Sequence, residues 1–244
     1  LTNEKIDDID IATVLSAEEI KEKFKDTNFK VLETGIKHGT VTLVSDNFKL
    51  ELTTLRKDVK TDGRHAEVEL INNWHLDSER RDFTINSIYL DINGNIFDPQ
   101  MGTVDLKNNN VKFIGDPQKR ITEDYLRIIR FIRFKIMYDS KVEPTTSDAI
   151  KQNLNGIRKI SKERILTELF KILELRNFIN LNKSDYLKEI FVLIFPEFEN
   201  IKRLDRLSKI CDHSQIKKEL LLSVLLIDEK NSHEYFGHKY NVSN

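Results

Sequence analysis

The hydrophobic pattern of this chain changes its period near Gly115-Asp116-Pro117. Before that point, runs such as 40–44 and 48–55 are rich in β-branched and apolar residues, and the turn residues at 45–47 join them into a predicted hairpin. After it, apolar residues recur at the three- and four-residue spacing of helices. The change restricts the fold to the α+β class, with a mixed head followed by an all-α extension.

Local signals place the individual elements. Ser16-Ala17-Glu18-Glu19 is a capping box and predicts a helix over 17–24. Short strands are expected at 31–34 and 111–114, and a turn at 93–95. Helices are expected over 77–90, over 120–137 as one continuous helix, from Ser161 onward, and at 184–195, 201–210 and 214–227.

Two acidic residues share one face of a strand that is predicted near the start of the chain. In Asp8-Ile9-Asp10-Ile11, alternate residues point the same way, so the two aspartates lie about 6 to 7 Å apart, whereas Asp7 points to the other face. Such carboxylates can converge on one or two Mg²⁺ ions, as in phosphoryl or nucleotidyl transfer. Glu51, which alternates with leucines on the hairpin strand, is the best third ligand. The alternative is an edge strand that carries solubilising charges.

Asp124 and Arg127 are three residues apart in the helix expected over 120–137, so they are predicted to be neighbours on one face. With Asp124 as hydrogen-bond acceptor and Arg127 as donor, the pair is complementary to the edges of cytosine and adenine, which carry an exocyclic amine beside a ring nitrogen. It is not complementary to guanine and uracil, which carry the reversed pattern. The alternative is a surface ion pair of small energetic effect. Arg127, Arg130 and Arg133 form a stripe that either binds phosphates or is a solvated face.

Bulk composition bounds the class of protein. The single cysteine, Cys211, excludes an internal disulfide and fits a reducing compartment. No apolar stretch is long enough to span a bilayer and no signal peptide is expected, so the prediction is a cytoplasmic protein without a membrane partner. Acidic residues are in excess before residue 120 and basic residues after it. That asymmetry suits a metal-dependent half joined to a half that meets polyanions, or charges scattered over solvated helices.

Taken in order, the polar strings of this chain resemble the motifs of the class II tRNA nucleotidyltransferase and poly(A) polymerase family, within the polymerase-β-like superfamily. The resemblance covers roughly residues 6–175. The strings that carry it are Asp8-Ile9-Asp10-Ile11-Ala12-Thr13, Thr34-Gly35-Ile36-Lys37-His38-Gly39-Thr40, Glu51-Leu52-Thr53-Thr54-Leu55-Arg56, Arg80-Arg81-Asp82-Phe83-Thr84-Ile85-Asn86-Ser87, Asp98-Pro99 with Gly102 and Asp105-Leu106, Glu123-Asp124-Tyr125-Leu126-Arg127 with Arg130-Phe131, and Ile160-Ser161-Lys162-Glu163-Arg164-Ile165 with Glu168-Leu169.

The resemblance implies a polymerase-β-like nucleotidyltransferase head with a mixed or antiparallel sheet at 1–116, a helical neck at 117–178 and part of a helical body at 179–244. It implies Mg²⁺-dependent, template-independent addition of C, C and A to the 3′ end of tRNA from CTP and ATP, with release of pyrophosphate. The expected partner is the acceptor stem and 3′ end of tRNA, bound by a monomer or homodimer. Open alternatives are an A-adding, CC-adding or poly(A)-adding relative, and a catalytically silent RNA-binding fold.

The resemblance also implies roles for residues at matching positions. The carboxylates expected to hold the two metal ions are Asp8 and Asp10. The residues expected to bind the nucleotide are Arg81, Asp82 and Asn86 at the ribose and phosphates, and Asp124 and Arg127 at the base, supported by Glu123 and Arg130. The residues expected in the flexible loop over 57–67 are Asp62, Gly63 and Arg64. Glu163 and Arg164 are expected to brace the neck helices.

The sequence departs from the family pattern in two places. The glycine-rich motif Gly-Gly-x-x-Arg-Asp, whose amides help to seat the triphosphate, is expected just upstream of Asp8 and is not in the sequence, which begins at Leu1. The region after residue 179 is also shorter than the usual body and tail. Because Leu1 enters the pattern within a motif, we expect the sequence to be an excerpt of a longer protein.

Overall fold

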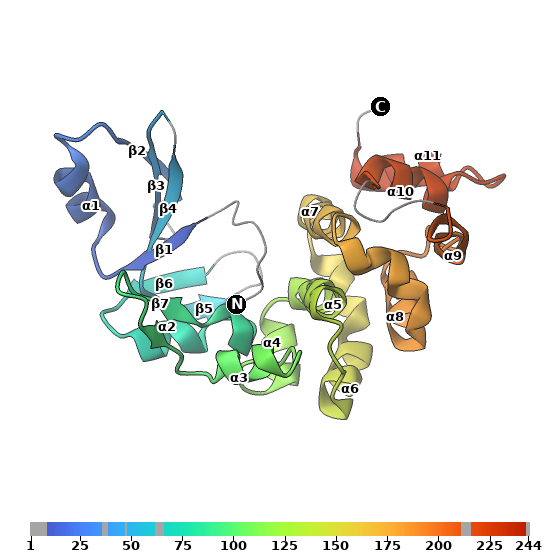
Figure 1. The fold of residues 1–244 in the computed structure, drawn as a ribbon, viewed down its shortest axis with the longest axis horizontal. Coiled ribbons are helices and arrows are strands. Elements are labelled where there is room, and N and C mark those ends of the chain that lie inside the picture. Colours follow the sequence, from blue (N-terminus) through green and yellow to red (C-terminus); the bar gives the residue numbers. More distant parts are fainter. Residues whose placement is uncertain (1–8, 36–38, 47, 62–65, 211–215, 243–244) are drawn as a thin grey trace. The chain divides into compact units, whose positions relative to one another are not determined.

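The computed structural model describes residues 9–35, 39–46, 48–61, 66–210 and 216–242 (Figure 1). The chain divides into two compact units, Leu1–Arg81 and Asp82–Asn244, which are called the N-terminal and the C-terminal unit below. Within the described ranges, no helix has both the length and the apolar character needed to cross a membrane.

A four-stranded sheet forms the centre of the N-terminal unit. Its strands, in spatial order, are β1 (Asp10–Thr13), β4 (Lys49–Thr54), β3 (Thr40–Val44) and β2 (Lys30–Gly35). β1 runs parallel to β4 and the other pairs are antiparallel, which confirms the mixed sheet and the β3–β4 hairpin (Figure 1). Apolar side chains alternate along these strands and gather on one face, so polar side chains are left on the other.

Helix α1 (Ala17–Phe24) covers the apolar face and begins at the predicted capping box. The Ser16 hydroxyl accepts a hydrogen bond from the Glu19 amide at 3.2 Å, and the Glu19 carboxylate accepts one from the Ser16 amide at 2.7 Å. Two otherwise unpaired amides at the helix start are satisfied in this way, so the helix begins where the sequence signal places it. Ile20 is fully buried in the small core between α1 and the sheet.

The N-terminal unit continues through a second hairpin, made of β5 (Arg56–Thr61) and β6 (Ala66–Leu70), into the short helix α2 (Trp74–Glu79). The Asn73 side chain accepts a hydrogen bond from the Leu76 amide at 3.1 Å and caps α2.

The C-terminal unit opens with short elements before its helices begin. They are the 3-10 turn η2 (Thr84–Asn86), the paired strands β7 (Tyr89–Leu90) and β8 (Ile96–Phe97), and helix α3 (Gly102–Lys107). Asp98 accepts hydrogen bonds from the Gly102 amide at 2.7 Å and from the Thr103 amide at 2.8 Å, so its carboxylate caps α3. A side chain at Gly102 would overlap the Thr84 carbonyl, which explains why a glycine stands there.

The helix predicted over 77–90 is wrong, because α2 ends at Glu79 and the chain then becomes extended. Phe83 is extended (φ −123°, ψ 149°), fully buried and bridged to Phe113, with the two ring centroids 4.7 Å apart. Burial of this aromatic pair outweighs the local helical pattern. The strand predicted at 111–114 is wrong too, since within the described residues only this single bridge forms there. The predicted turn at 93–95 is confirmed.

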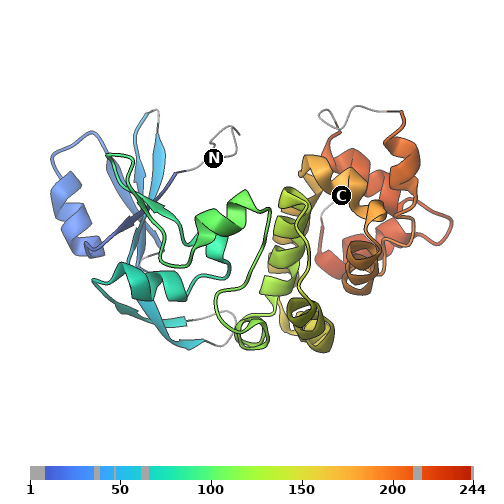
Figure 2. The same cartoon turned by 60° about the horizontal axis from the view of Figure 1, so that its bottom comes forward.

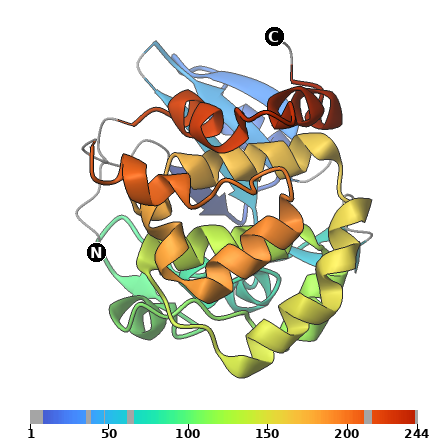
Figure 3. The same cartoon turned by 90° about the vertical axis from the view of Figure 1, so that its right-hand side faces the viewer.

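Helices make up the remainder of the C-terminal unit and share one core that extends from Phe83 to Tyr240. α5 packs against α7, and α4 packs against α6 (Figures 2 and 3). The helices are α4 (Pro117–Glu123), α5 (Leu126–Tyr138), α6 (Pro144–Asn153), η3 (Leu154–Lys159), α7 (Lys162–Leu173), η4 (Arg176–Lys183), α8 (Asp185–Ile194), α9 (Arg203–Leu207), α10 (Lys218–Leu226) and α11 (Ser232–Tyr240).

The continuous helix predicted over 120–137 is wrong, because it breaks at Asp124, whose backbone is extended (φ −153°, ψ 106°). The Asp124 carboxylate accepts a hydrogen bond from the Leu126 amide at 3.1 Å. Such a local side-chain bond competes with helical hydrogen bonding, so α4 ends at Glu123 and α5 begins at Leu126. The helix start predicted at Ser161 is confirmed, with Ser161 as the residue that precedes α7.

Candidate functional site

Two carboxylates lie next to each other on the polar face of the N-terminal sheet. Asp10 on β1 is in register with Glu51 on the parallel neighbour β4. Glu51 alternates with Leu50 and Leu52, which pack in the core under α1, and residues in register share a face, so both carboxylates belong to the face opposite that core. Asp10 is exposed, and Glu51 is contacted by Lys49, whose Nζ lies 3.4 Å from Oε1. Asp8 lies outside the described residues, as do Asp62, Gly63 and Arg64 of the expected loop.

The chemistry of this pair fits a hard divalent cation. Asp10 and Glu51 offer only carboxylate oxygens, the donors that Mg²⁺ takes together with water and substrate phosphates. Among the described side chains, no group of three or more His, Cys, Asp or Glu is gathered closely enough to form a complete metal cage. A pair of carboxylates leaves coordination positions for water and substrate phosphates, as in a site that shares its metal with a substrate.

Arg81 lies just beyond the end of α2 and is held by a carboxylate that the sequence analysis did not single out. Its NH2 atom lies 3.2 Å from Oδ2 of Asp77, which is fully buried. The neighbouring Arg80 lies 2.9 Å from Oδ1 of the same carboxylate. The spacing of three and four residues from Asp77 to the two arginines is the sequence signal that could have found it.

Asp82, Asn86 and Arg130, three of the predicted nucleotide-binding residues, are brought together in the C-terminal unit. The Asp82 carboxylate is 8% exposed and accepts hydrogen bonds from Asn86 Nδ2 at 2.8 Å and from Arg130 Nε at 2.5 Å. Burial acts to raise the pKa of Asp82, but the charge of Arg130 and these hydrogen bonds outweigh it and lower that pKa. Asp82 is therefore ionised at neutral pH.

The pair between Asp82 and Arg130 continues into helix α7 through Glu168, which the sequence analysis quoted only as part of a motif. Glu168 is buried and lies 3.7 Å from Arg130 NH1 and 2.9 Å from Arg133 Nε. The Arg133 guanidinium also stands 4.3 Å from the ring centroid of Phe134. The arginine stripe of α5 is thus engaged in buried contacts, which contradicts the interpretation of a solvated face for Arg130 and Arg133.

Asp124 and Arg127 lie on either side of the break between α4 and α5, so they are not neighbours on one helix face as predicted. The Asp124 carboxylate pairs with Arg164 of α7, with Oδ2 2.6 Å from NH2. Arg127 pairs with Glu123 at 2.6 Å and donates to the Arg120 carbonyl at 2.7 Å. A backbone hydrogen bond of 3.0 Å from the Arg127 amide to the Asp124 carbonyl still keeps the two residues within one turn.

The conformation of this break is fixed by Tyr125, which packs on Gly156 of η3. A methyl group at Gly156 would overlap the Tyr125 ring, and Lys159 Nζ stands 5.4 Å from the centroid of that ring. The close approach requires glycine and ties the backbone between Asp124 and Leu126 to the next helical segment.

Replacing Gly156 with alanine is expected to destabilise the protein by about 1–3 kcal/mol, because the partly buried ring of Tyr125 must shift to admit the methyl group. Urea unfolding followed by circular dichroism measures the change. Gly237→Ala is the matched control: it lies within α11 with no atom closer than 4.0 Å, so it should stabilise by about 0.5–1 kcal/mol. Equal stability of Gly156→Ala and the parent protein would contradict the packing argument.

Comparison with known proteins places these residues in a family. The family model described as "Poly A polymerase head domain" matches residues 1–112, and the model described as "Probable RNA and SrmB- binding site of polymerase A" matches residues 141–201. The chain belongs to the tRNA nucleotidyltransferase and poly(A) polymerase family.

Relatives in this family extend over both units. The chain is 41% identical over 230 residues to "CCA tRNA nucleotidyltransferase 1, mitochondrial" of Homo sapiens, a match to 92% of this chain and 53% of the relative. It is 34% identical over 235 residues to the "CCA-adding enzyme" of Staphylococcus haemolyticus, a match to 95% of this chain and 56% of that protein. The chain therefore spans about half the length of the curated relatives it matches.

A solved structure of the family confirms the polymerase-β-like fold. The CCA-adding enzyme of Bacillus stearothermophilus in complex with CTP matches with a TM-score of 0.73 and 28% sequence identity, over 98% of this chain and 58% of that chain. The combination of a mixed sheet with a long helical region is thus that of a family nucleotidyltransferase head and its adjoining helices.

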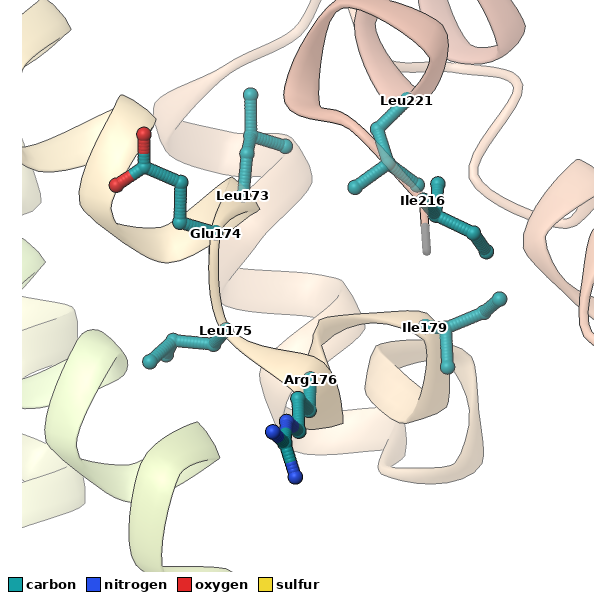
Figure 4. A pocket seen from close by; sticks show the side chains of 7 residues that line it. All are labelled: Leu173, Glu174, Leu175, Arg176, Ile179, Ile216 and Leu221. Carbon is teal, nitrogen blue, oxygen red and sulfur yellow. The ribbon is translucent and has the colours of Figure 1, made fainter. Parts of the chain in front are cut away.

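A pocket in the C-terminal unit is separate from all the predicted site residues. It lies at the end of α7 and is lined by mainly apolar side chains, with Glu174 and Arg176 as its charged members (Figure 4). Its lining residues are Leu173, Glu174, Leu175, Arg176, Ile179, Ile216 and Leu221. Glu174 is paired with Lys218 at 2.5 Å.

Proposed function

We propose that this chain is the catalytic head and adjoining helical region of a template-independent nucleotidyltransferase that adds C, C and A to the 3′ end of tRNA from CTP and ATP. The observation that carries the proposal is the 41% identity to a CCA tRNA nucleotidyltransferase over 92% of this chain, which includes both units. The proposed organisation is a head at 1–116, a neck at 117–178 and part of a body at 179–244, with the acceptor stem and 3′ end of tRNA bound by the helical region. A monomer or homodimer and a cytoplasmic location stay predictions.

In the proposed reaction, the 3′ oxygen of the tRNA forms a bond to the α-phosphorus, the bond to the β-phosphate oxygen breaks, and pyrophosphate leaves. Asp10 and Glu51, with Asp8, would hold Mg²⁺, which when bound offsets negative charge on the phosphate oxygens. Arg81, held by Asp77, supplies a guanidinium for a ribose or phosphate oxygen. Asp10 and Glu51 lie on neighbouring strands of one sheet, which is a rigid support for a metal site.

Base selection is proposed to rest on Asp124 as acceptor and Arg127 as donor. A cytosine or adenine edge offers an amine to Asp124 and a ring nitrogen to Arg127, whereas guanine and uracil place donor against donor. Arg164 and Glu123 pair with these two residues and can hold them in place, so the base meets oriented groups.

Poly(A) addition is the second candidate, because both matching family models are described in terms of poly(A) polymerase. The two activities differ in their nucleotides. A CCA-adding enzyme extends a tRNA that lacks its CCA end by two residues with CTP alone and by three with CTP and ATP, whereas a poly(A) polymerase makes long products with ATP alone.

The test is incorporation of labelled CTP and ATP by the protein, expressed at full length, into tRNA that lacks the CCA end. We expect products of the two lengths given above, and no extension with UTP or GTP. Binding of both nucleotides without incorporation would instead favour a catalytically silent RNA-binding fold.

A further inference from the structure

The buried carboxylate of Asp77 organises the part of the N-terminal unit that precedes the predicted nucleotide-binding string. It is fully buried in α2 and accepts hydrogen bonds from Arg56, Arg80 and Arg81. Oδ1 accepts from the Arg56 amide at 3.1 Å and from Arg80 Nε at 2.9 Å. Oδ2 accepts from Arg81 NH2 at 3.2 Å. The two oxygens therefore bind different partners. Oδ1 binds the Arg56 amide of β5 and the Arg80 side chain, and Oδ2 binds the Arg81 side chain.

The two arginines differ in what remains exposed. The Arg80 side chain is 13% exposed, and both its Nε and its NH2 lie 2.9 Å from Oδ1. The Arg81 side chain is 31% exposed, and its NH2 lies 3.2 Å from Oδ2. Two N–H groups of Arg80 thus converge on one oxygen of the buried carboxylate and compensate part of its charge. Arg81 contacts the other oxygen and presents part of its side chain to solvent.

Three arginines gather around this carboxylate. Burial, followed by the positive charge of Arg80, lowers the pKa of Arg56 to about 10. Arg56, Arg80 and Arg81 bring three positive charges to the Asp77 carboxylate, and Asp58 adds a second negative charge that acts on Arg56. The guanidinium of Arg81, whose side chain is 31% exposed, can bind an anionic ligand, and a polyphosphate fits because a guanidinium can bind it bidentately.

We propose that Asp77 is a positioning residue: its Oδ2 orients Arg81 for contact with the triphosphate of CTP or ATP. The inference rests on the proposed function and adds to it a residue that touches no substrate. Without Oδ2, Arg81 keeps its charge but loses the contact that fixes one edge of its guanidinium. Nucleotide binding then weakens, because the side chain must be ordered at the moment of binding.

The test is Asp77→Asn, alone and combined with Arg81→Gln. Asparagine keeps an oxygen for the donors at Oδ1 and places its amide against Arg81, donor to donor, so it disrupts mainly the Oδ2 contact. We expect the KM for CTP, and the Kd for CTP measured without tRNA, to rise about tenfold, with kcat within about twofold. In the Arg81→Gln background, Asp77→Asn should cause no further rise.

A structural role gives a different pattern. If Asp77→Asn weakens CTP binding by the same factor in both backgrounds, it acts through the fold, and the inference is overturned. Glu79→Gln removes an exposed charge from the same helix and is the matched control, expected to leave Kd unchanged. If Asp77→Asn does not fold, Arg81→Lys is the alternative test, because lysine keeps the positive charge but lacks the planar guanidinium that contacts Asp77. A wild-type Kd for Arg81→Lys would equally overturn the inference.

Measuring the Kd for CTP without tRNA tests this inference independently of the proposed function. A wild-type protein that binds CTP but incorporates neither CTP nor ATP refutes the proposed function, while the Kd values of the variants still decide the role of Asp77. Inorganic tripolyphosphate as a competitor identifies the part of the nucleotide concerned. It should displace CTP from the wild-type protein about tenfold more effectively than from Asp77→Asn, and equal displacement would overturn the inference.

Discussion

Replacing Asp10 with alanine is expected to reduce nucleotide incorporation about a thousandfold and to leave the protein folded. Asp10 is exposed and in register with Glu51, so its carboxylate contributes to the proposed metal site and not to the core between α1 and the sheet. Loss of one metal-binding carboxylate removes several kcal/mol of transition-state stabilisation, and each 1.4 kcal/mol corresponds to a factor of ten. The measurement is single-turnover incorporation of labelled CTP into tRNA without its CCA end.

The control for Asp10 is Asp26→Ala, which removes an exposed acidic side chain from the same unit, outside the candidate site. It should keep wild-type incorporation, and both variants should keep the wild-type circular dichroism spectrum and melting temperature. Unchanged turnover of Asp10→Ala would remove Asp10 from the catalytic site and with it the proposed metal position. Higher Mg²⁺ should rescue Asp10→Ala in part, because a weakened site still fills at high concentration.

The sheet of the N-terminal unit was predictable because its signals are local. Strict alternation along 40–44 and 48–55 determines which side chains face the core, and the turn residues between them determine the pairing. The same alternation placed Glu51 on the face that it shares with Asp10. The capping box at Ser16 gave the start of α1 to the residue, since both of its hydrogen bonds are made within one turn.

The break at Asp124 could not be predicted because it depends on distant residues. The apolar spacing from 120 to 137 is compatible with one helix throughout. The extended conformation of Asp124 is stabilised by Arg164, which is 40 residues away in the sequence, and by the packing of Tyr125 on Gly156. The early end of α2 has the same kind of cause, the burial of Phe83 against Phe113. Pairs of this kind are visible only after the chain has folded.

The buried charges of the C-terminal unit form a connected set, and this determines how its residues respond to substitution. Asp82 forms an ion pair with Arg130, and both Arg130 and Arg133 form ion pairs with Glu168. Asp82, which the sequence analysis assigned to the nucleotide, is therefore also connected to α5 and α7. Residues in one network do not contribute independently. Loss of activity at Asp82 or Arg130 is therefore evidence for nucleotide contact only when stability is measured beside it.

Replacing Asp82 with alanine is expected to destabilise the protein by about 3–5 kcal/mol, the usual effect of leaving a buried charge without its partner. Arg130 would lose its 2.5 Å contact while Glu168, at 3.7 Å, compensates only in part. Urea unfolding at pH 7 measures the loss. The matched double variant, Asp82→Ala with Arg130→Met, removes both charges and should recover a large part of the stability, because neither charge is then left unpaired.

The pH dependence of this difference tests whether charge is the cause. The folded-state pKa of Asp82 is lowered, so the stabilisation by its charge is complete above the unfolded-state pKa of about 3.9 and is lost as pH falls through the folded-state value. The stability gap between the parent protein and Asp82→Ala should therefore be constant from pH 8 to pH 5 and should shrink only under more acidic conditions. Two outcomes would mean that packing around Asp82, and not its charge, stabilises this part of the unit. One is a stability difference that already shrinks between pH 7 and pH 5, and the other is a double variant that is no more stable than Asp82→Ala.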